Sequence, residues 1–153
     1  MLHCLEAKQF IKSDLQTVWD FMSSPKNLSL ITPAYMGFHI LSDLSNTKMY
    51  PGQIIEYKVS PVAGLKMHWV TEITHVQDKQ YFVDEQRFGP YAFWHHKHFL
   101  NEVPGGVEMT DIVHYKAPFG FMGRIANALF IKKQLQNIFD YRYNKVEEIF
   151  NAK

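Results

Sequence analysis

The stretch FVDEQRFGPYAFWHHKHFLNEVPGGVEMTDIVHY, residues 82–115, contains three predicted β-strands separated by two turn segments. Gly89 and Pro90 mark the first turn, and Pro104 and Gly105 mark the second, because glycine and proline are strong interrupters of regular structure. An earlier turn at residues 78–79 joins the first of these strands to the strand before it. Since a tight hairpin fixes which residues face one another, the three turns predict the register of four consecutive antiparallel strands.

The register makes specific cross-strand neighbours. The predicted pairs are Ile73 with Asp84, Thr71 with Gln86, Gln86 with Trp94, Asp84 with His96, Phe82 with His98, His98 with Asp111, His96 with Val113 and Trp94 with Tyr115. All three hairpins agree on which side chains share a face. One slip by a single residue would turn a whole strand over, so this agreement supports the assignment.

The two faces of the predicted sheet differ in the number of charged side chains they carry. One face carries many charged residues: Glu72, Glu85, Arg87, His95, Lys97, Glu108, His114 and Lys116. The other face is mostly apolar and has a polar stripe across it, and it comprises Trp69, Thr71, Ile73, Phe82, Asp84, Gln86, Phe88, Trp94, His96, His98, Leu100, Met109, Asp111, Val113 and Tyr115. We expect the second face to be the buried one, because a one-sided antiparallel sheet buries its apolar side.

The histidines at 95, 96 and 98 therefore do not form one cluster. His95 is predicted to point to solvent, whereas His96 and His98 point inward. A buried carboxylate is costly unless it is paired, so we expect Asp111 to pair with His98 and Asp84 to pair with His96. Three interpretations remain open: the pairs only satisfy one another in a packed core, they offer hydrogen bonds to a ligand, or one histidine acts as a general acid or base.

The remainder of the chain completes an α+β order. Strands are predicted at 2–11, 35–43, 52–60, 65–77, 80–88, 92–102 and 107–116, and two short helices follow the first strand at about 13–22 and 25–33. After residue 120, apolar residues recur at helical spacing as far as Phe150, which predicts one long amphipathic helix. All helices are expected on one side of a seven-stranded sheet, with a gap between the sheet and the last helix unless large side chains fill it.

The composition excludes several classes of protein. The 153 residues are predicted to form a single domain, 1–153, and 46% hydrophobic and 20% charged residues are ordinary for a globular protein. A net charge of +1 and the lack of a basic run argue against a nucleic-acid partner. No apolar run is long enough to span a bilayer. The single cysteine, Cys4, is expected to be buried in the first strand, and the cytoplasm is the expected location.

Metal and nucleophile motifs are weak in this sequence. His96, His98 and Glu102 have the His-x-His-x3-Glu spacing of the cupin metal motif, but the preceding glycine spacing is off by one residue and no second histidine motif follows. The long final helix is also foreign to a cupin. No Gly-x-Ser-x-Gly elbow and no phosphate-binding loop is present. We therefore expect no metal and no other cofactor.

Several short motifs together resemble a known superfamily. They are Asp-x-Gln at Asp84 and Gln86, Gly-Pro at Gly89 and Pro90, Trp-x-His-x-His at Trp94, His96 and His98, Asp-x-Val-x-Tyr at Asp111, Val113 and Tyr115, and Pro-Phe-Gly at Pro118, Phe119 and Gly120. With the order of elements, they resemble the START and birch-pollen-allergen (SRPBCC) helix-grip superfamily, and most closely its bacterial branch of polyketide cyclases and dehydratases. The resemblance covers essentially the whole chain. It implies a curved seven-stranded sheet wrapped around the last helix, with a cavity for lipids, sterols, polyketides or other hydrophobic molecules.

Function is expected to follow from that cavity. We expect binding of a small hydrophobic ligand. One alternative is an enzyme of the cyclase or dehydratase kind that uses His96 or His98 as acid or base. The other alternative is a protein-interaction module with a filled core. Arg142 of the last helix either extends to solvent or reaches an acidic partner or an anionic group of a ligand. The start of that helix either seals the cavity or makes transient contact with a membrane. The expected ligand-binding residues are Trp69, Thr71, Asp84, Gln86, Trp94, His96, His98, Asp111, Val113, Tyr115, Phe139 and Arg142.

Overall fold

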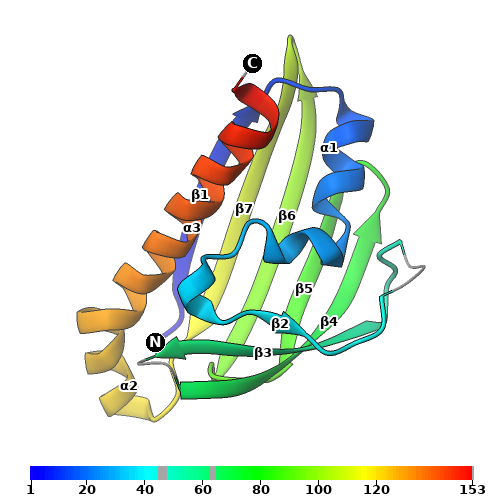
Figure 1. Cartoon of the computed structure of the whole chain (residues 1–153). Helices are drawn as coiled ribbons and strands as arrows, with labels where there is room; N and C mark the ends of the chain where they lie inside the picture. The colour runs from blue at the N-terminus through cyan, green and yellow to red at the C-terminus, as the bar shows by residue number, and fades with distance from the viewer. Residues whose placement is uncertain (45–47, 63–64, 153) are drawn as a thin grey trace.

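The computed structural model describes residues 1–44, 48–62 and 65–152. Seven antiparallel strands form one sheet in the order β1-β7-β6-β5-β4-β3-β2, and the helices pack on one side of it (Figure 1). The strands are β1 His3–Ile11, β2 His39–Ile40, β3 Gln53–Val62, β4 Leu65–Gln77, β5 Tyr81–Phe88, β6 Phe93–Val103 and β7 Gly106–Lys116. The helices are α1 Leu15–Met22, the 3-10 turns η1 Pro25–Ser29 and η2 Ala34–Met36, and the C-terminal elements α2 Gly120–Ala126, η3 Asn127–Ile131, α3 Lys132–Val146 and η4 Glu147–Asn151. The predicted α+β helix-grip architecture is confirmed.

The strand register agrees with the sequence prediction along most of the sheet. Asp84 lies opposite His96, and Phe82 lies opposite His98. On the next strand, His98 faces Asp111, with His96 facing Val113 and Trp94 facing Tyr115. The predicted pair of Gln86 and Trp94 is replaced, because the β5–β6 pairing ends at Glu85 and His95. The loop that follows is held instead by the Gln86 side chain, which accepts a hydrogen bond from the Tyr91 backbone N–H and donates one to the Tyr91 carbonyl.

The predicted strand at 35–43 is wrong for most of its length. Only His39 and Ile40 pair with β3, and the 3-10 turn η2 precedes them. Gly37 ends that turn with a φ of 53°, a left-handed conformation that glycine adopts readily. Met36 and Phe38, whose alternation suggested a strand, instead line the cavity described below. The second predicted helix, at 25–33, is likewise shorter and is the 3-10 turn η1.

Local signals explain where the first helix begins. Asp14 caps α1, and its carboxylate accepts hydrogen bonds from both the backbone N–H and the hydroxyl of Thr17. This satisfies a donor that the first helical turn would otherwise leave free. One side of α1 is buried, and it is formed by Val18, Trp19 and Met22. The prediction that Cys4 is buried is wrong, because Cys4 lies on the outer side of β1 and is exposed.

The C-terminal elements form one helical run over residues 120–151 that lies along the sheet beside β1 (Figure 1). Its α3 part buries one stripe, formed by Leu135, Phe139, Arg142 and Val146. Those positions recur at spacings of four, three and four, which places them on a single side of an α-helix. This stripe closes the interior from the helix side.

The start of the same helical run faces solvent. Phe119, Phe121, Met122, Ile125, Leu129 and Phe130 are between 47% and 82% exposed. The expectation that these apolar residues seal the cavity is therefore wrong. Within this C-terminal helical run, the residues that line the cavity all come from α3, and α2 lies beyond them near the N-terminus of the chain (Figure 1).

Replacement of Leu135 by alanine should lower the free energy of unfolding by about 2–5 kcal/mol, because Leu135 is buried between the helix and the sheet. The matched control is Leu129→Ala, the same substitution at an exposed position of the same helical run, which should change it by less than about 0.5 kcal/mol. Urea denaturation measures both. Equal effects of the two substitutions would show that α3 does not pack as described.

Candidate functional site

A cavity of about 170 Å³ lies between the sheet, α3 and the segment from α1 to η2. An apolar cavity of about 150 Å³ already accommodates a molecule the size of benzene. The walls of the cavity in this protein are mostly apolar. They are formed by Phe21, Met22, Ser24, Pro25, Asn27, Leu28, Ile31, Thr32, Met36, Phe38, Met49, Ile55, Tyr57, Val59, Trp69, Thr71, Ile73, Phe82, Asp84, Tyr91, Trp94, His96, His98, Leu135, Ile138, Phe139 and Arg142.

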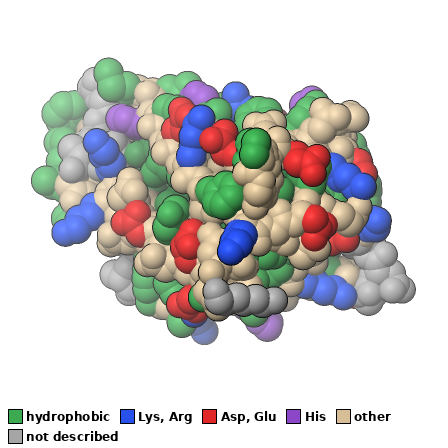
Figure 2. Space-filling view, turned by 90° about the horizontal axis from the view of Figure 1, so that it is seen from above, with side chains coloured by type: hydrophobic (Ala, Val, Ile, Leu, Met, Phe, Trp, Pro, Cys, Tyr) green, Lys and Arg blue, Asp and Glu red, His purple; other side chains and the backbone are tan. Residues whose placement is uncertain are grey.

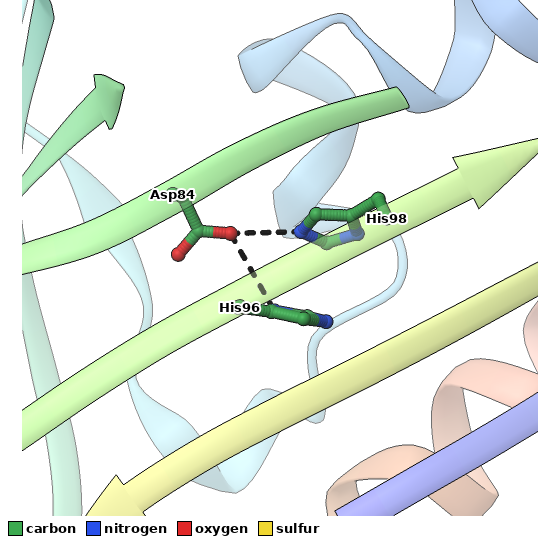
Figure 3. Close-up of side chains that lie close together, drawn as sticks. All are labelled: Asp84, His96 and His98. Atoms are coloured by element: carbon green, nitrogen blue, oxygen red, sulfur yellow. Dashed lines mark hydrogen bonds and ion pairs between the residues drawn. The ribbon is translucent and has the colours of Figure 1, made fainter. Parts of the chain in front are cut away.

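Three polar residues in this wall lie together on neighbouring strands. Figure 3 shows Asp84 of β5 pointing toward His96 and His98 of β6. The Asp84 Oδ2 atom is 2.7 Å from His98 Nε2 and 3.5 Å from His96 Nδ1. The two imidazole rings are 3.7 Å apart at their centres because side chains two positions apart on a strand point the same way.

Asp111 lies on the other side of the two histidines. Its Oδ1 atom is 2.8 Å from His98 Nδ1 and 3.1 Å from His96 Nε2. Both predicted pairs, Asp111 with His98 and Asp84 with His96, are present. Each histidine also contacts the second carboxylate, so the four side chains form one network, which we call the His–Asp network.

Arg142 completes the charge balance from the helix. Its Nη2 atom is 3.5 Å from Asp111 Oδ1 and 3.4 Å from His98 Nδ1. Arg142 thus reaches an acidic partner and does not extend to solvent, and its side chain is buried. The sheet and α3 are therefore joined by an ionic contact inside the protein.

The two histidines have opposite pKa shifts despite their proximity. Burial and the nearby positive charge of His98 lower the pKa of His96 to about 4. Burial also lowers the pKa of His98, but hydrogen bonds and charge from Asp111 and Asp84 outweigh it, so the net pKa of His98 is raised. His96 is therefore neutral near neutral pH, whereas His98 keeps its proton to a higher pH than an ordinary histidine does.

Both carboxylates remain ionised in this setting. Burial opposes ionisation of Asp111, but the charge of Arg142 and the hydrogen bonds from the histidines hold its pKa well below the usual range. The pKa of Asp84 is also lowered, because the positive charge that His96 gains at low pH and the hydrogen bond from His98 outweigh the effect of burial. Arg142, which contacts Asp111, offsets part of this negative charge.

Aromatic side chains form the wall beside the network. The ring of Trp94 lies 5.2 Å from that of Trp69 and 4.9 Å from that of Tyr91, measured between centroids. Trp94 Nε1 donates a hydrogen bond of 3.3 Å to Asp84 Oδ1. Trp69 Nε1 is buried, and within the described part of the chain no acceptor lies within hydrogen-bond distance of it. A donor of this kind is costly in a cavity wall unless a bound molecule or water pairs with it.

The sequence-predicted site residues fall into two groups. Trp69, Thr71, Asp84, Trp94, His96, His98, Phe139 and Arg142 lie in the cavity wall. Gln86, Asp111, Val113 and Tyr115 lie beside the wall. Gln86 positions Tyr91, and Asp111 supports the histidines from behind.

Sequence reasoning missed wall residues that lie outside the regular strands. Tyr91 comes from the β5–β6 loop, and Leu28 and Met36 come from or near 3-10 turns. No periodic pattern places such residues. Ile55, Tyr57 and Val59 alternate along β3 and are all buried, so their period-two pattern could have found them.

The residues that can hold a metal ion differ from those of the cupin-like spacing. Glu102 is exposed near the end of β6, whereas the third group beside His96 and His98 is Asp84. One ligand atom from each of Asp84, His96 and His98 lies within 4.8 Å of the other two. The linear motif failed to find Asp84 because this residue lies on the adjacent strand.

The opposite pKa shifts predict an optimum of stability near pH 6.5 for the metal-free protein. From about pH 4 to about 6.5, the unfolded chain binds a proton at His96 that the folded chain does not, so the free energy of unfolding rises with pH. Above about 6.5, the folded chain keeps the proton on His98 longer than the unfolded chain does, so the stability that this proton provides is lost as pH rises through the folded pKa.

Urea denaturation over a pH series measures this dependence, with a limit of about 1.4 kcal/mol per pH unit for each group. His96→Gln should remove the part on the acid side that comes from His96, and His98→Gln should remove the decline on the alkaline side. His95→Gln is the control, because His95 lies on the other face near Glu85. A pH profile unchanged in both His96→Gln and His98→Gln would contradict the assignment.

Comparison by sequence finds no match to a known protein family and none to a curated protein. Comparison by structure finds many similar chains. A START superfamily protein from Mycobacterium smegmatis has a TM-score of 0.70 at 11% identity, over 96% of this chain and 99% of that one. Ara h 8.0201 has a TM-score of 0.61 at 12% identity, over 97% and 99%.

An uncharacterized protein from Rhizobium leguminosarum has a TM-score of 0.69 at 13% identity, over 97% of this chain and 96% of that one. Identities this low establish the fold and not the function. They agree with the resemblance found in the sequence, although nothing in them distinguishes the polyketide cyclase branch. The chain has the helix-grip fold of the START and birch-pollen-allergen (SRPBCC) superfamily.

Proposed function

We propose that this chain, as one domain, binds a small hydrophobic ligand between the sheet and α3. The observation that carries the proposal is the cavity itself, with its apolar walls and one polar side. Binding sites for small molecules combine a mostly apolar surface with a few polar groups that fix orientation. Here we expect the apolar wall to provide affinity, and Trp69 Nε1 and the His–Asp network to fix the orientation of the ligand.

The unpaired donor narrows the chemistry of the ligand. Trp69 lines the cavity, and its buried Nε1 has no hydrogen-bond partner among the described residues, so an acceptor oxygen on a ligand that reached this atom would satisfy it. The volume of about 170 Å³ suits a molecule on the order of one ring unless the walls move. We infer a small, largely apolar molecule with at least one hydrogen-bond acceptor, such as an aromatic ketone or a short polyketide.

Filling the cavity should abolish binding. Leu28→Trp places a larger side chain in the wall, and we expect affinity for aromatic ketones to fall at least roughly tenfold. The matched control is Leu30→Trp, two residues further along, where the side chain is 54% exposed and is not part of the wall. Thermal-shift and calorimetric titrations against a hydrophobic library measure both variants. No response of the wild type to any compound, or equal binding by both variants, would count against the proposal.

A cyclase- or dehydratase-like enzyme is the second candidate. The observation that favours it is the position of the His96 imidazole, which lies in the cavity wall 3.5 Å from Asp84 Oδ2 and 3.1 Å from Asp111 Oδ1. With a poly-β-carbonyl substrate, His96→Gln should abolish turnover and leave affinity unchanged. Parallel loss of affinity and turnover would assign His96 a binding role instead.

The exposed apolar start of the helical run supports transient contact with a membrane. Among the described residues, no helix is both long and apolar enough to cross a bilayer. Figure 2 shows hydrophobic side chains gathered at the left edge of the view, the side on which α2 lies in Figure 1. Lys132 and Lys133 follow this segment and are exposed, which favours an anionic lipid surface.

A variant with Phe121→Ser and Phe130→Ser should lose most of any sedimentation with anionic vesicles, because both rings are 67% exposed and would insert into the interface. Phe10→Ser is the control, since Phe10 is 48% exposed on β1 and pairs with Glu108, at the other end of the sheet from this segment. The absence of wild-type sedimentation, or sedimentation unaffected by the double substitution, would overturn membrane contact. Cavity binding should be unchanged in both variants.

A further inference from the structure

We propose that Asp84, His96 and His98 form a binding site for one divalent transition-metal ion of the zinc or ferrous class. The three side chains offer one carboxylate oxygen and two imidazole nitrogens on one side of the sheet (Figure 3). Two histidines and one carboxylate are a frequent ligand set for such ions when positions remain open for another ligand.

The separations already approach those of a ligand set. Asp84 Oδ2 is 2.7 Å from His98 Nε2 and 3.5 Å from His96 Nδ1. Ligand atoms about 2.0–2.2 Å from a shared ion are separated from one another by roughly 3–3.5 Å. Binding therefore requires adjustments of about an ångström or less at these two contacts. A proton now lies between His98 and Asp84, and it would leave to solvent as the metal takes its place.

The groups behind the histidines match those expected around a metal. A histidine ligand usually donates its second ring N–H to a carboxylate, which fixes the ring and the tautomer. Here His96 Nε2 is 3.1 Å and His98 Nδ1 is 2.8 Å from Asp111 Oδ1, so a single carboxylate would orient both rings. Arg142 contacts the same Asp111 oxygen at 3.5 Å and balances its charge, which leaves Asp84 as the anionic ligand.

The open side of the site faces the cavity. Asp84, His96 and His98 all line the cavity wall, whereas Asp111 does not. The ring of Phe82 stacks on His98 at 4.0 Å, and that of Phe139 lies 5.7 Å from His96. An ion here would have protein ligands on the sheet side and free positions toward the apolar chamber. The inference concerns the ion alone and does not depend on which molecule, if any, enters the cavity.

Cobalt(II) is a suitable probe, because it takes zinc sites and has visible absorption that reports its ligands. Full-length protein stripped with EDTA and then titrated with Co²⁺ should bind one ion per chain. In crystals soaked with Co²⁺, anomalous scattering should place the ion about 2.0–2.2 Å from Asp84 Oδ2, His96 Nδ1 and His98 Nε2. An ion located elsewhere, or no stoichiometric binding, would overturn the proposal. This measurement uses the wild-type protein, so it does not depend on whether any variant folds.

Variants give a second test. His96→Gln and His98→Gln should each weaken Co²⁺ and Zn²⁺ binding by at least tenfold, whereas His95→Gln, on the same strand but on the opposite face, should bind as the wild type does. Asp111→Asn should have an intermediate effect, because it disturbs the orientation of the rings and removes no ligand. Equal affinity in His95→Gln, His96→Gln and His98→Gln would contradict the assignment. If Co²⁺ binds while no compound enters the cavity, the metal site stands and the proposed ligand function fails.

Discussion

The buried charge of Asp111 is the constraint on which the interior of this protein depends. The side chain is only 2% exposed, in the middle of β7, where an unpaired carboxylate would cost several kcal/mol. Three side chains that contact the carboxylate offset that cost. His96 and His98 come from the neighbouring strand, and Arg142 comes from α3. Packing of the helix on the sheet and organisation of the polar side of the cavity thus share the same residues. A change that displaces α3 also removes a cation from the site.

This arrangement explains how one strand supplies two histidines with different properties. His96 and His98 contact the same two carboxylates, yet burial dominates at His96 and the carboxylates dominate at His98, so their pKa values move apart. The result is one ring with a lowered pKa and one ring with a raised pKa, side by side next to the cavity. This arrangement of the two histidines arises from cross-strand register, because β5 and β7 place one carboxylate on each side of β6.

Much of this site could be predicted from the sequence, because register and facing in an antiparallel sheet follow from turn positions. The turns near Lys79, Gly89 and Gly105 were sufficient to place Asp84 and Asp111 beside the two histidines. The sequence could not reveal that each histidine contacts both carboxylates, since this depends on ring orientation and on Arg142 arriving from a helix distant in sequence. It also could not place Tyr91, whose position depends on hydrogen bonds between its backbone and Gln86. The prediction of a strand at 35–43 was wrong because Met36 and Phe38 line the cavity, so their apolar character does not indicate strand pairing.

The central claim is that the space between the sheet and α3 holds a small molecule. Native mass spectrometry of the freshly purified protein tests it most directly, with the denatured protein as the reference mass. The account predicts an additional mass in the native spectrum that is lost on denaturation, is reduced in Leu28→Trp and is retained in Leu30→Trp. A native mass equal to that of the bare chain, both as purified and after incubation with a library of small aromatic ketones, would contradict it.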